Sequence, residues 1–204
     1  KYFMTAAAAL FACIAAMADT KTVSSPDGKL IVTIDSEDGK AFYSVKYNDK
    51  QMVERSALGL KANIADFSSG LTLRKADEKR IDENYTLRTA KASAVHYVAN
   101  QLNLTYDTKQ EHPMVVTFNV SNNDVAFRYS FPQVGETSCM VVNSEETSFR
   151  LPQHTTTFIC PQSEAMVGWK RTKPSYEEEY VADAPMNVKS KFGQGYTFPC
   201  LFRV

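Results

Sequence analysis

The chain has 204 residues, its 23 Lys and Arg balance its 23 Asp and Glu, and 44% of its residues are hydrophobic. This composition excludes an intrinsically disordered chain, a collagen-like repeat and a small disulfide-stapled protein. The absence of a basic surplus also argues against a nucleic-acid-binding protein, which needs cations to neutralise phosphates.

The first residues have the pattern of an export signal. Lys1 precedes an apolar run at 6–16, and small residues follow up to Ala18. A basic start, a short apolar stretch and an A-x-A end predict a secretory signal peptide over residues 1–18 and a periplasmic product. The run is too short for a stable transmembrane anchor. An outer-membrane lipoprotein attached at Cys13 is less favoured, because a bulky aromatic residue occupies the lipobox.

Alternation with a period of two dominates the rest of the chain and predicts half-buried strands. The clearest stretches are 30–35, 102–107, 115–120 and 125–131. Turn-forming clusters separate such stretches at 26–28, 37–39, 48–49 and 122–124. No segment after the signal has a capped helical stripe. We therefore expect an all-β fold, a large antiparallel β-sandwich of two large sheets in a single domain over residues 19–204.

The two ends of the sequence suggest a piece of a longer protein. The chain begins with Lys1 and ends in an alternating apolar stretch at 196–204, with no turn after it. A strand left unpaired at that point would be an aggregation hazard. We expect more chain after Val204, so that the domain is C-terminally incomplete.

The cysteines give a weak signal. Cys139, Cys160 and Cys200 remain after signal cleavage, an odd number without C-x-x-C spacing. We expect small buried apolar side chains, although export would permit a disulfide and the sequence leaves that open.

Common catalytic signatures are absent. The sequence contains no G-x-S-x-G, H-E-x-x-H, Walker or EF-hand pattern. His96, His112 and His154 are scattered without metal-ligand spacing, so we expect surface or hydrogen-bonded histidines.

One segment stands out, at residues 169–180. It holds Trp169, which is the only tryptophan, three consecutive carboxylates at 177–179, and flanking Tyr176 and Tyr180. Such a triplet is usually a solvated loop. Carboxylates beside aromatic faces also suit sugar chemistry or a hard cation such as calcium. Trp169, Tyr176 and Tyr180 are weak candidates for substrate contacts.

Several phrases together, in order and spacing, resemble the N-terminal domain of glycoside hydrolase family 97. They lie at 25–30, 56–60, 66–71, 81–85, 124–132, 176–180 and 198–202. The resemblance covers almost the whole chain after the signal.

The resemblance implies a β-sandwich (supersandwich), here truncated before a catalytic (β/α)8 barrel that cleaves α-glycosidic bonds in exported bacterial enzymes. The principal catalytic carboxylates would lie on the barrel, and this fragment alone would be inactive. The sandwich would supply one Ca2+ ligand, which the resemblance places at Glu177, with Glu178 and Glu179 as alternatives in register. The sequence leaves three questions open: whether the substrate is a glucoside or a galactoside, whether hydrolysis inverts or retains the anomeric configuration, and what the oligomeric state is.

Two rival hypotheses belong to other functional classes. A free-standing carbohydrate-binding module would use Trp169, Tyr176 and Tyr180 as a sugar platform. A structural sandwich of a surface assembly would need no ligand. Sugar modules generally need several exposed rings, because stacking adds only about 0.5–1.5 kcal/mol beyond burial, so we favour core packing for Trp169.

Overall fold

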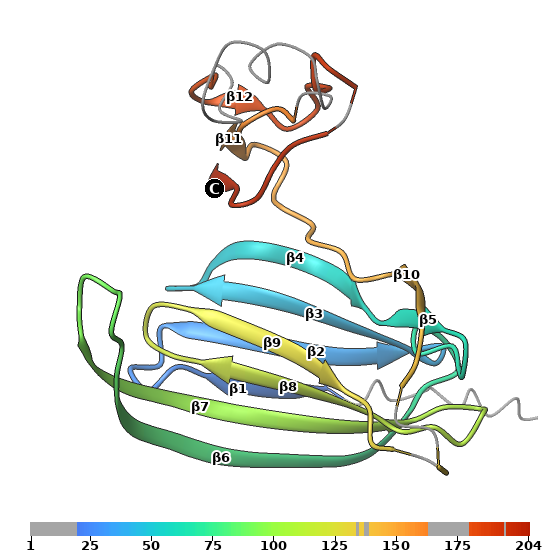
Figure 1. Ribbon diagram of the computed structural model, residues 1–204. Coiled ribbons are helices and arrows are strands. Elements are labelled where there is room, and N and C mark those ends of the chain that lie inside the picture. Colours follow the sequence, from blue (N-terminus) through green and yellow to red (C-terminus); the bar gives the residue numbers. More distant parts are fainter. Residues whose placement is uncertain (1–19, 134, 137–138, 163–179, 194) are drawn as a thin grey trace, which may run out of the picture.

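The computed structural model describes residues 20–133, 135–136, 139–162, 180–193 and 195–204 (Figure 1). Strands and turns make up this part of the chain, and it contains no helix. The strands are β1 (Lys21–Ser24), β2 (Leu30–Glu37), β3 (Lys40–Tyr47), β4 (Lys50–Leu58), β5 (Leu60–Ala62), β6 (Thr72–Thr86), β7 (Ala94–Asp107), β8 (Met114–Val120), β9 (Val125–Ser130), β10 (Val142–Glu145), β11 (Thr156–Phe158), β12 (Ala184–Pro185) and β13 (Leu201–Arg203).

Two antiparallel four-stranded sheets form the body of the protein. One has the strand order β1-β2-β3-β4 and the other the order β6-β7-β8-β9. The sheets lie face to face (Figure 1). The alternating stretches predicted from the sequence fall in β2, β7, β8 and β9, except that the last stretch runs one residue past β9, to Phe131. The predicted all-β antiparallel sandwich is therefore confirmed.

The core lies between these two sheets. Its largest fully buried side chains include Tyr43 of the first sheet and Phe118 of the second, whose ring centroids are 6.0 Å apart. The Tyr43 hydroxyl donates a hydrogen bond to the Ser148 carbonyl at 3.0 Å. Burial raises the pKa of Tyr43 to about 12, and the nearby Tyr129 adds to the rise. Inward-facing side chains of the two sheets thus meet across the sandwich.

Two tight hairpins set the register of the first sheet. Asp38 and Gly39 join β2 to β3, and Asn48 and Asp49 join β3 to β4. All four residues have positive φ, between 46° and 72°. Positive φ at both central residues is the requirement of the two-residue type I′ hairpin, which matches the twist of the flanking strands. The predicted turns at 37–39 and 48–49 are confirmed.

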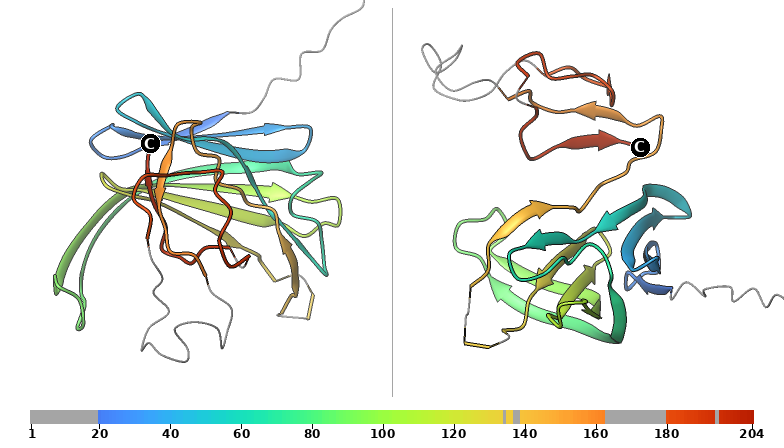
Figure 2. Two further views of the ribbon diagram at one scale, coloured as in Figure 1. Left: turned by 90° about the horizontal axis from the view of Figure 1, so that it is seen from above. Right: turned by 90° about the vertical axis from the view of Figure 1, so that its right-hand side faces the viewer.

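Two smaller sheets were not expected. β10 pairs with β5, and a three-stranded sheet has the order β12-β11-β13. The three-stranded sheet lies beside the sandwich rather than within it (Figures 1 and 2). The expectation of two sheets is thus incomplete, because β5, β10, β11 and β12, with two to four residues each, are too short to show a period-two pattern. β13 lies within the alternating stretch noted at 196–204.

The cysteine prediction is partly wrong. Cys160 is buried as expected, whereas Cys139 is exposed and Cys200 is partly buried. Cys139 lies in an irregular segment before β10, in which the next residue, Met140, packs against the core and Cys139 does not. Cys139 and Cys200 carry free thiols, so neither is bonded to Cys160.

The predicted signal peptide, residues 1–18, lies outside the described residues, and export stays a prediction. Within residues 20–204, as far as the structure describes them, no helix has the length and apolar character needed to cross a membrane.

Candidate functional site

Most of the predicted site lies outside the described residues. Trp169, Tyr176 and the three carboxylates Glu177, Glu178 and Glu179 all belong to the segment 163–179. Their predicted roles as calcium ligand and sugar contacts therefore stay predictions. Tyr180 is the one member of the set that the structure places.

Both ends of that segment are attached to the three-stranded sheet. β11 precedes it in the chain and β12 follows it. Asp183 accepts a hydrogen bond from the Thr156 hydroxyl at 3.0 Å and pairs with Arg203 at 2.8 Å. The Thr157 hydroxyl also donates to the Ala184 carbonyl at 3.2 Å. The sheet thus holds the described residues on both sides of 163–179, which we call the acidic segment.

Tyr180 stacks on an aromatic ring that sequence reasoning missed. Its ring centroid lies 4.9 Å from that of Phe158, and the ring planes differ by 13°. Both side chains are exposed, Tyr180 by 44% and Phe158 by 43%. Phe158 sits in a short strand with no charged or aromatic neighbours in sequence, so no pattern pointed to it. The pair forms a small aromatic surface, and Tyr180 directly follows the acidic segment in sequence.

Apolar surface gathers on this same sheet. A cavity of about 310 Å³ is lined mainly by apolar side chains, among them Ile159, Pro161, Val181 and Val188. Other exposed apolar residues lie in β13 and just before it: Phe198, Leu201 and Phe202, whose exposed fractions are 89%, 63% and 38%. Large exposed apolar side chains gathered on one small sheet make it a candidate interaction site.

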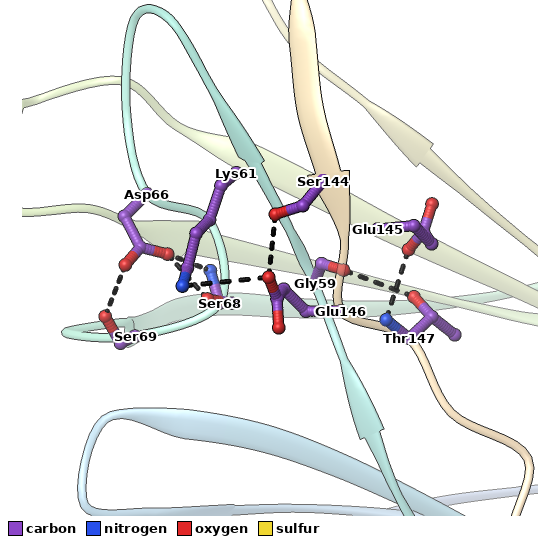
Figure 3. Close-up of polar contacts among 9 residues, drawn as sticks. All are labelled: Gly59, Lys61, Asp66, Ser68, Ser69, Ser144, Glu145, Glu146 and Thr147. Atoms are coloured by element: carbon purple, nitrogen blue, oxygen red, sulfur yellow. Dashed lines mark hydrogen bonds and ion pairs between the residues drawn. The ribbon is translucent and has the colours of Figure 1, made fainter.

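A polar pocket lies at one end of the sandwich, around the phrase at 66–71 (Figure 3). Asp66 accepts hydrogen bonds from the Ser68 backbone at 2.8 Å and from the hydroxyls of Ser68 and Ser69 at 2.6 and 2.8 Å. Burial favours the neutral acid, but these hydrogen bonds outweigh it and hold the pKa of Asp66 below its ordinary value. Asp66 is therefore a turn-forming carboxylate.

Glu146 occupies the other side of this pocket of about 360 Å³. It accepts a hydrogen bond from the Ser144 hydroxyl at 2.7 Å, and the Lys61 ammonium lies 3.6 Å from the same oxygen (Figure 3). Both carboxylates of the pocket thus have partners within the protein, and its lining includes no aromatic ring. The arrangement anchors loops and offers little to a sugar.

Next to this pocket, the Tyr129 hydroxyl joins three segments of the chain. It accepts a hydrogen bond from the Gly59 backbone N–H at 2.9 Å and contacts the Thr147 hydroxyl. Thr147 in turn donates to the Gly59 carbonyl at 3.3 Å. Burial raises the pKa of Tyr129 despite these hydrogen bonds.

Replacing Tyr129 with Phe should destabilise the domain by about 1–3 kcal/mol, because the Gly59 N–H loses its acceptor at a partly buried place. Thermal unfolding measures the loss. Tyr85→Phe is the matched control, since the Tyr85 side chain is 44% exposed and should cost at most about 0.5 kcal/mol. Equal effects of the two substitutions would contradict the role given to the Tyr129 hydroxyl.

The described residues do not form a metal site by themselves. No group of three or more His, Cys, Asp or Glu side chains in this part of the chain could hold an ion. His96 is exposed, and its Nε2 lies 2.7 Å from an Asp82 carboxylate oxygen, as expected of a surface histidine. A calcium site would therefore need ligands from the acidic segment or from outside these residues.

Comparisons with known proteins agree with this fold. The family model described as Glycosyl-hydrolase 97 N-terminal matches residues 23–204. A solved structure described as a beta-arabinopyranosidase is similar, with 50% identity and a TM-score of 0.83, over 90% of this chain and 29% of that chain.

A Glycoside Hydrolase Family 97 enzyme variant from Pseudoalteromonas sp. strain K8, in complex with panose, has 23% identity and a TM-score of 0.73. The match covers 90% of this chain and 26% of that chain, and at this identity it supports the fold alone. The chain thus spans less than a third of the length of these proteins. Because the family model covers residues 23–204 of the 204 residues, the chain belongs to the N-terminal domain family of glycoside hydrolase family 97.

Proposed function

We propose that this domain serves an exported glycosidase by packing on the catalytic domain through the three-stranded sheet and by presenting Glu177 to the active site. One observation carries the proposal: the sheet that holds both ends of the acidic segment also exposes an apolar surface. A sheet that positions a carboxylate in a neighbouring domain must be attached to that domain, and an exposed apolar surface can provide the attachment. Of the three rings proposed for a free-standing sugar module, Tyr180 alone belongs to the described residues, and it stacks on Phe158.

Glu177 would give the carboxylate oxygen of one calcium ligand, with Glu178 and Glu179 as the alternatives. Calcium takes six to eight oxygen ligands, so a site can collect them from two domains. When bound, the ion supplies a positive charge that stabilises negative charge on the leaving group. The role of this chain is to position the carboxylate.

For the substrate we propose a pyranoside of galacto configuration. A β-linked L-arabinopyranoside has the ring stereochemistry of an α-linked D-galactopyranoside and lacks only its exocyclic hydroxymethyl group. The similarity to a protein described as a beta-arabinopyranosidase therefore favours the galactoside branch of the expected α-glycosidases over the glucoside branch. The two sugars would present the same axial C4 hydroxyl to the site.

The full-length enzyme should hydrolyse nitrophenyl β-L-arabinopyranoside and α-D-galactopyranoside at least about 100-fold faster, in kcat/KM, than the α-D-glucopyranoside. The physical reason is that a site built to hydrogen-bond one hydroxyl strongly rejects the epimer that misplaces it. Residues 19–204 alone should show no turnover of any of the three. Preferred hydrolysis of the glucoside would contradict the substrate class, and turnover by the domain alone would contradict the division of labour.

A further inference from the structure

β6 is a long edge strand. It spans Thr72–Thr86, 15 residues, and lies at the end of the sheet order β6-β7-β8-β9. One side of its backbone is paired with β7 along its length. No other strand of the described residues pairs with its outer side, and its side chains are almost all exposed (Figures 1 and 2). Such an edge is a template for another strand.

The far half of the β6–β7 hairpin extends beyond the rest of the sheet. β8 pairs with β7 only between Asn100 and Tyr106, so the stretches 81–86 and 94–99 pair with each other alone (Figure 1). A two-stranded ribbon has little burial to stabilise it in water. The ribbon would gain stability from a partner along β6.

β6 carries charges of both signs in alternating blocks. Positive residues at 74–75 and 79–80 alternate with negative residues at 77–78 and 82–83. When two copies of this sequence run antiparallel, residues of opposite sign can face each other over part of the strand. An edge meant only to repel other strands would be better served by charges of one sign, because opposite charges on facing strands attract.

Symmetry restricts the register. A two-fold axis relating two antiparallel strands of one sheet stands perpendicular to the sheet, so facing residues must belong to the same face of β6. Centring the axis on Lys79 places Glu78 opposite Arg80, Lys75 opposite Glu83, and Leu73 opposite Tyr85. The two Lys79 side chains face each other, with Asp77 of each copy as a diagonal neighbour.

Glu78 and Arg80, the pair next to Lys79, are available for ion pairs with a second copy. Lys75 lies 2.8 Å from Asp77, and Asp82 lies 2.7 Å from His96, so these groups already have partners within the hairpin. Glu78 and Arg80 have no ion pair with any described residue. They would gain a partner in the second copy.

We propose that β6 pairs antiparallel with β6 of a second copy about Lys79, which joins the two four-stranded sheets into one continuous sheet across a two-fold dimer. The proposal rests on the edge strand and its charge pattern, so it stands or falls separately from the substrate and the calcium ligand. Its partner is this chain itself.

The test measures the dimer dissociation constant of the full-length enzyme by sedimentation at several protein concentrations. Arg80→Glu should raise that constant by about tenfold or more, because it turns two attractive cross-strand pairs into repulsive ones. The double variant Glu78→Arg with Arg80→Glu exchanges the charges and should restore the wild-type value. Lys91→Glu, in the exposed hairpin turn, makes the same change of net charge and should leave the constant unchanged.

A monomeric wild type at all concentrations would overturn the proposal and leave the charges as protection of a free edge. A dimer that ignores Arg80→Glu, or that Lys91→Glu weakens equally, would also overturn it. So would a double variant that stays as weak as Arg80→Glu. Circular dichroism of each variant checks that the domain is folded, which exposed surface substitutions should allow.

Discussion

Replacing Glu177 with Gln in the full-length enzyme should weaken calcium binding by about tenfold or more and lower kcat with it. The amide keeps the shape of the side chain but removes a negative charge, and calcium affinity depends strongly on the number of charged ligands. Calorimetric titration of the metal-free enzyme with calcium measures the affinity. Excess calcium should restore part of the lost rate, because the weakened site can still be filled by mass action.

Glu178→Gln and Glu179→Gln are the matched controls, since they make the same chemical change one and two residues away. A solvated carboxylate contributes almost nothing, so both variants should behave like wild type. If one of them loses calcium instead and Glu177→Gln does not, the register is wrong but the site exists. If all three behave alike and calcium has no effect, the acidic triplet is a solvated loop.

The sandwich itself could be predicted from the sequence because its central strands bury one face. In β8, Val116, Phe118 and Val120 are fully buried, and the same alternation is written into the sequence. The hairpin turns were equally readable, since Asn48 and Asp49 adopt the positive φ that their residue types favour. One-sided burial produces apolar alternation, and tight turns require particular residue types, so both can be recognised in a sequence.

The edge strand and the small sheets could not be predicted in the same way. β6 exposes nearly all of its side chains, so its charged sequence has no apolar alternation to reveal a strand. β11, β12 and β13 have three, two and three residues, and they are held by pairing across distances of up to about fifty residues in the chain. The alternating stretch at 196–204 marks the place of β13, but the pairing of all three strands depends on their partners, which no local pattern encodes.

In the candidate site, too, local sequence predicted some features, whereas others depend on contacts between distant segments. Tyr180 could be singled out because it flanks the acidic triplet, yet its stacking on Phe158 depends on how β11 lies beside the residues before β12. The phrase at 66–71 marked the family, and the structure gives it a physical reason: Asp66 holds the loop through Ser68 and Ser69. A residue that shapes a loop and one that performs chemistry look alike in sequence.

Gly59 shows how tightly that loop is packed. Its φ is +130°, a backbone conformation that residues other than glycine avoid. A Cβ atom there would lie 2.7 Å from the Ser68 Cα and would overlap the Phe67 carbonyl oxygen. These backbone atoms belong to the loop at 66–71. The Phe67 N–H of this loop donates a hydrogen bond to the Leu60 carbonyl at 2.9 Å. Neither side can retreat without breaking a hydrogen bond.

Gly59→Ala should therefore destabilise the domain by about 2–5 kcal/mol, the sum of backbone strain and overpacking. For a domain of this size the unfolding transition should fall by roughly 5–15 °C in scanning calorimetry. Gly28→Ala is the matched control: Gly28 also has positive φ, at 75°, but a Cβ there would meet nothing within 4 Å. It bears the strain without the clash, so its transition should fall by roughly 2–4 °C, which corresponds to about 1 kcal/mol. Equal shifts for the two variants would mean that the loop at 66–71 yields to the extra methyl group, and that its packing against Gly59 is looser than these distances imply.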